Sequence, residues 1–273
     1  HSCRSGGTAL AGLLSQNPAL HVTATNDLSL LISGIQNQWT GMDGFRAQGL
    51  ESLVPRMRGL LRGAIHGFYE DEFGDGRSVV DKSRDWIRNI ELMEEVLEKP
   101  FRIILCIRDV RDAVASLEKL FRENCITRPS RNVEQQLTGQ TIMDRCKQYL
   151  ANDAMLGMTI NAIKDCFEKG LNDRLLIVPY HCLVDDPVGT VNKIHEDFGL
   201  GSFFCDPSNL KNASKEDDQV HGRKFHELRP QIDHSAVGRW RQYLTVEVAE
   251  WLNSEYDSIQ NLAHGDHVCG WSK

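Results

Sequence analysis

Short apolar runs alternate with stretches of helical periodicity along most of this chain. Apolar runs at residues 78–82, 101–107 and 175–178 predict three short buried strands. Apolar residues recur at helical spacing over residues 86–97, so the first two strands and this helix form a predicted β-α-β unit. Buried strands separated by helices are typical of parallel sheets that are covered on both faces. We therefore expect an α/β fold with a central parallel β-sheet flanked by helices on both faces.

The remaining periodic stretches predict further helices. They extend over residues 9–15, 50–68, 110–120, 142–167 and 246–259. The acidic run at residues 70–75 is interpreted as a solvated turn. The chain has no internal repeat and its length suits one large domain, so we expect a single domain over residues 1–273. Within it, the charged segment 211–229 is expected to be a loop near a cofactor or substrate.

Composition and charge narrow the function classes. With 41% hydrophobic and 25% charged residues, the 273-residue chain has an ordinary globular composition. A formal net charge of −7 argues against a non-specific nucleic-acid binder, which needs a broad basic face. No apolar run is long enough to cross a bilayer, and the opening residues lack a secretory pattern. We expect a cytoplasmic protein with no membrane segment in this sequence, although a signal or anchor before residue 1 stays open.

The 8 cysteines are scattered and form no Cys-x-x-Cys pair. None has a histidine partner at the spacing of a zinc site, so the sequence does not call for a metal. Reduced, mostly buried thiols are the expectation.

Two segments have the composition of loops that bind an anion at the start of a helix. The first is Arg4-Ser5-Gly6-Gly7-Thr8, ahead of the amphipathic stretch 9–15. The second runs over residues 108–116, after a predicted strand. Unpaired N–H groups and the positive end of the helix dipole suit such loops to phosphate-like groups. Because the glycine loop begins at residue 4, we expect the strand that should feed it to be truncated.

Three further polar residues follow or close predicted strands. They are Lys82, Arg108 and Tyr180. In parallel α/β folds, ligands lie beyond the carboxyl ends of the strands. Together with the two loops, these residues predict a site for a ligand with phosphate-like groups at two ends.

These motifs resemble the sulfotransferase family that uses 3′-phosphoadenosine 5′-phosphosulfate (PAPS), nearest to its tyrosylprotein and carbohydrate-type branches. The likeness covers residues 4–244, and it implies a P-loop NTPase-like fold. The family's loop for the 5′-phosphosulfate is Pro-Arg-Ser-Gly-Thr-Thr, where this chain has Cys3 for Pro and Gly7 for one Thr. The resemblance implies that this loop holds the 5′ end of PAPS through Arg4, Ser5, Gly6, Gly7 and Thr8.

The family's 3′-phosphate signature is an Arg that closes a strand, with a Ser on the next helix. Arg108 and Ser116 match it inside an Arg-Asp-x-Arg-Asp context, the most specific motif in the chain. Lys82 resembles the family's strand-end Lys, which contacts the bridging oxygen of the phosphosulfate. Tyr180 resembles the Tyr of a strand-ending Tyr-x-x-Leu that precedes Asp-Pro. Arg239 lies in Gly-Arg-Trp-Arg-Gln-Tyr-Leu, which is similar to a late family segment whose basic residue reaches the cofactor.

Each of these residues also has a structural interpretation. Lys82 could be a solvated strand-end lysine and Arg4 a surface residue of a frayed terminus. Arg108 could form a structural ion pair with a neighbouring Asp, and Ser116 could be a small packing residue. Tyr180 could be a core residue at the rim, and Arg239 a partner for the adjacent Trp. These alternatives stay open at the level of sequence.

The general base is the least determined residue. Counting forward from the glycine loop, the position of the tyrosylprotein branch's Glu is Thr25, and the position of the cytosolic branch's His is Arg84. We therefore take Asp27, close to the first of these positions, as the first candidate. It could equally cap the following helix. His66 and Asp85 are weaker candidates.

The sequence thus favours an enzyme that moves the sulfuryl group of PAPS to a hydroxyl or amine acceptor and releases adenosine 3′,5′-bisphosphate. Its catalytic residues would be Lys82, Arg4 and Asp27, and no metal is implied. A nucleotide-dependent kinase of similar fold is one alternative, although the loop lacks the Gly-x-x-x-x-Gly-Lys-Ser/Thr pattern. A non-catalytic nucleotide-binding relative without a base is another. The acceptor, whether a small molecule, carbohydrate or peptide, and the oligomeric state stay open.

Overall fold

The computed structural model describes residues 4–123, 141–211 and 230–265. Its strands are β1 (Leu20–Thr25), β2 (Ser78–Lys82), β3 (Ile103–Ile107) and β4 (Leu175–Pro179). The helices of the first half are α1 (Gly7–Leu14), α2 (Leu28–Trp39), α3 (Asp43–Gln48), α4 (Leu50–Phe68), α5 (Glu70–Gly74), η1 (Asp85–Asn89), α6 (Ile90–Leu97) and α7 (Val110–Glu123). Those of the second half are α8 (Ile142–Tyr149), α9 (Met155–Glu168), η3 (Asn172–Arg174), α10 (Tyr180–Asp185), α11 (Pro187–Asp197), η4 (His234–Ala236), η5 (Arg239–Gln242), α13 (Val246–Glu255) and α14 (Asp257–Ala263).

The strands pair in parallel, two by two. β1 lies beside β2, with Leu20 opposite Ser78 and Thr25 opposite Lys82. β3 lies beside β4 in unbroken register over all five residue pairs. In the described residues these pairs are two separate two-stranded sheets. The chain passes from β2 to β3 through η1 and α6, and those two strands are not hydrogen-bonded to each other. The expected single hydrogen-bonded sheet is therefore divided, whereas its parallel direction is confirmed.

Both faces of β3 and β4 are covered, as the sequence predicts. Alternate residues of each strand join different apolar clusters: Leu105 and Ile177 pack with α7 and α9, while Cys106 and Val178 pack with α1 and α11. Side chains of successive strand residues point to opposite faces, so this alternation requires helices on both sides. The α/β class is thus confirmed.

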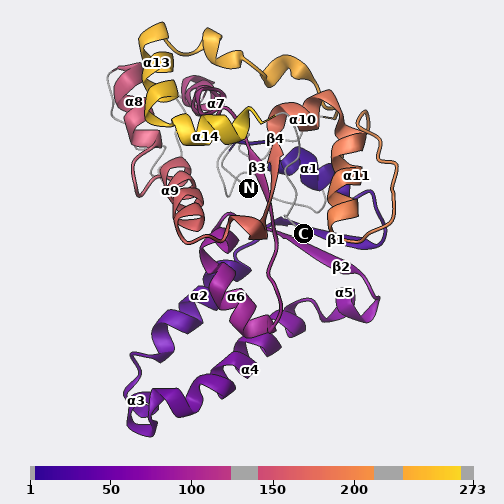
Figure 1. Ribbon diagram of the computed structural model, residues 1–273, viewed down its shortest axis with the longest axis vertical. Helices are drawn as coiled ribbons and strands as arrows, with labels where there is room; N and C mark the ends of the chain where they lie inside the picture. Colours follow the sequence, from indigo (N-terminus) through magenta and orange to yellow (C-terminus); the bar gives the residue numbers. More distant parts are fainter. Residues whose placement is uncertain (1–3, 124–140, 212–229, 266–273) are drawn as a thin grey trace.

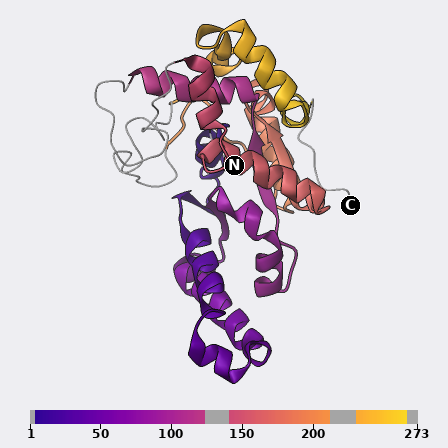
Figure 2. The same cartoon turned by 90° about the vertical axis from the view of Figure 1, so that its left-hand side faces the viewer.

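The helices nearest the glycine loop are separated in space from a helical arm formed by α2, α3 and α4. Both views place α3 and α4 at the end of the molecule opposite α13 (Figures 1 and 2). The arm returns to the body where Arg58 and Arg62 of α4 form ion pairs with Glu98, just after α6. Among the described residues, no helix has the length and apolar content needed to span a bilayer.

The structure differs from the sequence analysis at three places. Residues 20–25 form a strand that the sequence did not reveal, since Thr and Ala dilute its apolar alternation. The acidic run 70–75 folds as the short helix α5 rather than as a turn. The helix predicted over 142–167 is broken between α8 and α9. Gly157, in the first turn of α9, packs so closely on Ala151 in the break that a Cβ on Gly157 would lie 2.1 Å from the Ala151 carbonyl oxygen.

The cysteines within the described ranges are free thiols, and most of them are buried. They are Cys106, Cys146, Cys166, Cys182 and Cys205, of which only Cys182 is partly exposed. Burial raises the pKa of the Cys106 thiol to about 11, so it stays protonated at neutral pH. Most of the predicted loop at 211–229 lies outside the described residues.

Candidate functional site

Polar residues from three strands meet the glycine loop at one edge of the fold. Lys82 is the last residue of β2, while Arg108 and Tyr180 directly follow β3 and β4. All three residues thus lie at the carboxyl ends of parallel strands, where ligands bind in this architecture.

The glycine loop turns tightly against Tyr180. Gly6 has a φ of 91°, in the left-handed region, and its carbonyl accepts a hydrogen bond from the Leu10 amide at 3.0 Å. A Cβ on Gly6 would lie 2.5 Å from Cδ2 of Tyr180. Only glycine fits both the conformation and the space. The helix α1 therefore begins at Gly7, directly behind the loop, and Ser5 is buried beside it.

Lys82 reaches the same loop from β2. Its ammonium donates to Oγ1 of Thr8 at 3.2 Å, while its backbone amide donates to Oγ1 of Thr23 at 2.8 Å. Only 7% of Lys82 is exposed, so it is not the solvated strand-end lysine of the structural alternative. A buried ammonium at the start of α1 adds to the positive end of that helix.

Arg108 is a buried cation with few compensating charges. Its guanidinium donates to the carbonyl oxygens of Arg4, at 3.2 Å, and of Ala236, and stacks 4.6 Å from the ring centre of Tyr180. Asp112 is its ion-pair partner in the described residues, at 3.8 Å. Burial lowers the pKa of Arg108, and Nε has no hydrogen-bond partner there. A nearly buried guanidinium with unused donor capacity is a fitting place for an anion.

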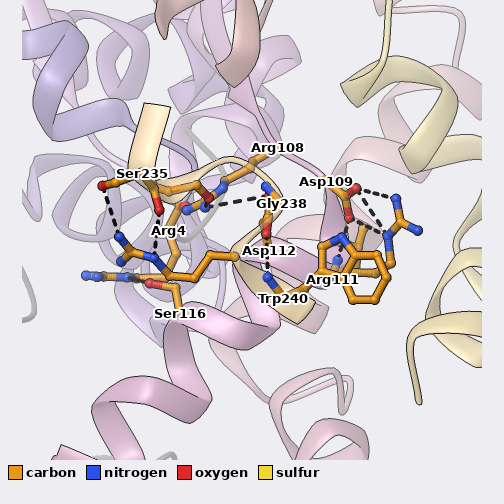
Figure 3. A network of polar contacts seen from close by, with 12 residues as sticks. Arg4, Arg108, Asp109, Arg111, Asp112, Ser116, Ser235, Gly238 and Trp240 are labelled. Atoms are coloured by element: carbon orange, nitrogen blue, oxygen red, sulfur yellow. Dashed lines mark hydrogen bonds and ion pairs between the residues drawn. The ribbon is translucent and has the colours of Figure 1, made fainter. Parts of the chain in front are cut away.

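Arg4 joins this cluster from the glycine loop. Its Nε donates to Oγ of Ser116 on α7 at 2.9 Å (Figure 3). The resemblance assigns Arg4 to the 5′ end of the ligand and Ser116 to the 3′-phosphate, yet here their side chains are in contact. Arg4 has a φ of 59°, unusual for a residue other than glycine.

The segment 234–242 closes the other side of the cluster. Arg239 donates from Nε to the Ser235 carbonyl at 3.0 Å and from Nη2 to the Ser235 hydroxyl at 3.1 Å. Its charge contributes to lowering the pKa of Arg108, after burial itself. Asp112 accepts from the amides of Gly238 and Trp240, at 2.8 Å and 2.9 Å, and so ties this segment to α7.

The candidate base lies where β1 ends beside β2. The Asn26 amide donates to the Lys82 carbonyl at 3.1 Å. Asp27 is the next residue, so its backbone lies close to that of Lys82. Asn26 Oδ1 accepts from the Leu28 amide at 2.7 Å, whereas the Asp27 side chain makes no capping bond. Asp27 is therefore the N-cap residue of α2 by position, but its exposed side chain does not cap the helix.

The weaker base candidates have other surroundings. Asp85 lies 3.9 Å from Arg88 in η1, and His66 lies on an exposed face of α4 near the ring of Phe73. Arg84 is half-buried at the start of η1.

The sequence analysis did not identify several residues whose contacts support the site residues. Asp112 was visible only as the second Asp of the Arg-Asp-x-Arg-Asp motif, and nothing in the sequence pointed to its backbone partners. Tyr69 and Asp81 form a short, half-buried hydrogen bond on the strand that ends in Lys82, and Asn26 donates to the same Tyr69 hydroxyl at 2.9 Å. Within the described ranges, no group of three or more His, Cys, Asp or Glu residues could hold a metal ion.

Comparison with known proteins supplies the family. No curated protein matches the chain. A model of the sulfotransferase domain matches residues 4–265, which include the glycine loop, the strand-end residues and the segment 234–242. The chain belongs to the sulfotransferase domain family, and its mixed α/β fold with parallel strands agrees with that membership.

Proposed function

We propose that this protein transfers the sulfuryl group of PAPS to a hydroxyl or amine group of a small-molecule, carbohydrate or peptide acceptor. Family membership supports sulfuryl transfer in general. The donor and its binding residues are our proposal, and they rest on the geometry of the site.

One observation carries the proposal: Arg4, Arg108 and Arg239 lie close enough for their charges to act on one another, and Asp112 is the carboxylate that pairs with Arg108 in the described residues. Arg4 contacts Ser116, and the charges of Arg4 and Arg239 both lower the pKa of Arg108, although burial lowers it most. Such a cluster repels itself unless an anion lies between its members. A 3′-phosphate would supply two negative charges and several acceptor oxygens, and the unused Nε of Arg108 fits it.

The second end of the donor would lie on the glycine loop. The backbone of Ser5, Gly6, Gly7 and Thr8 opens α1, whose amide groups suit a 5′-phosphosulfate. When bound, this group would supply the transferable sulfuryl moiety. Lys82, hydrogen-bonded to Thr8, would stabilise the negative charge that develops on the departing phosphate oxygen. Tyr180 would hold the loop and Arg108 in place, since its ring contacts both.

Asp27 is the proposed proton acceptor. It is exposed beside the end of β2 and its side chain makes no capping hydrogen bond to α2, so its carboxylate is available to an acceptor hydroxyl. A general base must reach the proton it removes, and the Asn26–Lys82 backbone contact keeps Asp27 near the transfer point.

The test is a calorimetric titration with adenosine 3′,5′-bisphosphate, with adenosine 5′-phosphate as the matched ligand without the 3′-phosphate. We expect wild type to prefer the bisphosphate strongly. Arg108→Ala should weaken bisphosphate binding about ten- to hundredfold, because hydrogen bonds to charged groups contribute about 1.5–3 kcal/mol. It should change binding of adenosine 5′-phosphate little. Equal binding of both nucleotides by wild type, or none by a folded sample, would contradict the proposal.

A further inference from the structure

The carboxylate of Asp112 is almost fully buried, and both of its oxygens are used. Oδ2 accepts from the Gly238 amide at 2.8 Å and Oδ1 from the Trp240 amide at 2.9 Å. The Asp112 side chain is 4% exposed. Hydrogen bonds from neutral donors to a buried carboxylate are strong, since the charge would otherwise lack solvation. This single side chain therefore joins α7 to a segment more than a hundred residues away (Figure 3).

The ion pair with Arg108 is the longest of these Asp112 contacts. The nearest Arg108 nitrogen lies 3.8 Å from Oδ2, beyond hydrogen-bond distance. Arg108 donates instead to backbone carbonyls, one of which, on Ala236, belongs to the same segment 234–242. Both carboxylate oxygens are thus engaged by backbone amides, in addition to the charge interaction with Arg108. The Arg108 Nε, which has no hydrogen-bond partner in the described residues, can still donate to an anionic ligand.

The geometry of the segment depends on these contacts. Gly238 has a φ of 69°, a left-handed turn that presents its amide to Asp112. The next residue, Arg239, lies between the two amides that Asp112 holds. The Trp240 ring contacts the guanidinium groups of Arg111 and Arg241, which lie 4.8 Å and 4.5 Å from its centre. The hydrogen bonds at Gly238 and Trp240, on either side of Arg239, therefore fix the position of the Arg239 backbone.

We infer that Asp112 is a positioning residue, which clasps segment 234–242 onto the start of α7 so that Arg239 faces Arg108 and Ser116. The inference rests on the proposed function, because it assigns the clasped segment to the 3′-phosphate side of the PAPS site. Asp112 itself does not contact the ligand: as a carboxylate it would repel a phosphate. Its contribution to binding is the backbone that it organises.

The inference and simple electrostatics predict opposite signs for Asp112→Asn. Removing a negative charge next to a phosphate site should strengthen phosphate binding if charge alone matters. An amide has one acceptor oxygen, so Asn cannot serve both backbone donors. We expect Asp112→Asn to weaken binding of adenosine 3′,5′-bisphosphate about tenfold or more, in line with the loss of a charged hydrogen bond. Binding of adenosine 5′-phosphate should change little.

Asp109→Asn is the matched control. It removes the same charge from the same end of α7, but the Asp109 carboxylate pairs with Arg111, Gln260 and His264, and no hydrogen bond between it and segment 234–242 is found in the described residues. We expect it to keep or slightly raise bisphosphate affinity. Gly238→Ala leaves Asp112 intact and disfavours the left-handed turn, so it should reproduce the loss even where Asp112→Asn folds poorly.

Hydrogen exchange gives a readout independent of affinity. The Gly238 and Trp240 amides should be protected in wild type and Asp109→Asn, and exchange faster in Asp112→Asn. Unchanged or tighter bisphosphate binding by a folded Asp112→Asn, with these amides still protected, would overturn the inference while leaving the proposed function intact. A wild type that binds neither nucleotide would overturn the proposed function and this inference with it.

Discussion

Next to Lys82, a carboxyl group is held in an unfavourable environment for its charge. Burial raises the pKa of Asp81, and the hydrogen bond from Tyr69, the nearby Trp86 side chain and the charge of His21 offset this only in part. The same burial, and then the charge of Asp81, raises the pKa of Tyr69 far above its usual range. Tyr69 thus remains the donor in this pair. Tyr69 is 4% exposed, and its hydroxyl engages Oδ2 of Asp81.

This environment predicts that Asp81 lowers the stability of the folded protein at neutral pH more than at acidic pH. A carboxyl whose pKa is higher in the folded than in the unfolded state loses stability as pH rises from about 4 through the folded pKa. Asp81→Asn has no charge to bury and keeps an oxygen that accepts from Tyr69. We expect the variant to melt at a higher temperature than wild type at pH 7, and the difference to shrink towards pH 4. Thermal unfolding of both proteins at the two pH values measures this.

Tyr69→Phe is the control for the same site. It keeps the ring but removes the donor, which leaves the Asp81 carboxylate less solvated at neutral pH. We expect it to destabilise the protein by about 1–3 kcal/mol at pH 7. An Asp81→Asn variant that melts below wild type at pH 7 would show that ionised Asp81 stabilises the fold.

The glycine loop is the element most constrained by its contacts. At Gly6, a side chain meets two obstacles, the left-handed φ of 91° and the Tyr180 ring 2.5 Å from an added Cβ. We expect Gly6→Ala to displace the loop or Tyr180 and to reduce bisphosphate affinity by more than tenfold, as measured by calorimetry. The left-handed conformation alone costs about 1–2 kcal/mol, and the contact adds to this.

Gly170→Ala separates the two causes. Gly170 has a φ of 69°, but nothing lies within 4 Å of an added Cβ. It precedes η3 at the amino-terminal end of β4, away from the carboxyl end where the candidate site lies. This variant should lose stability through the backbone alone and bind the nucleotide normally. Normal binding by Gly6→Ala as well would show that the loop tolerates a side chain and that its contact with Tyr180 is not needed.

Elements with strong periodicity could be predicted from the sequence, whereas those defined by packing could not. The helix α4 has the predicted bounds, because its apolar stripe of Leu53, Met57, Leu61 and Ile65 is regular. The strand β1 was missed, since six residues of mixed polarity carry little signal without β2 beside them. The division between α8 and α9 depends on a close backbone approach at Gly157, which no periodicity records.

At the scale of the whole molecule, the order of the site residues could be predicted and their contacts could not. The resemblance to the family implied that Arg4, Lys82, Arg108 and Arg239 serve one ligand. Which side chains meet depends on how distant segments pack: Arg4 contacts Ser116, and Asp112 binds the amides of segment 234–242. Backbone acceptors and donors have no signature in the sequence, so these links appear only in the fold.

Because four distant segments build the site, a ligand that bridges them should stabilise the entire fold. Adenosine 3′,5′-bisphosphate at a hundred times its dissociation constant should add about 2.7 kcal/mol. For a domain of this size, that corresponds to a rise of roughly 5–10 °C in melting temperature. Hydrogen exchange should show new protection at all four segments, around Thr8, Lys82, Arg108 and Trp240. Adenosine 5′-phosphate should protect the first two alone at equal saturation. Protection confined to one segment, without a melting shift, would mean that the ligand does not bridge the arginine cluster and the glycine loop.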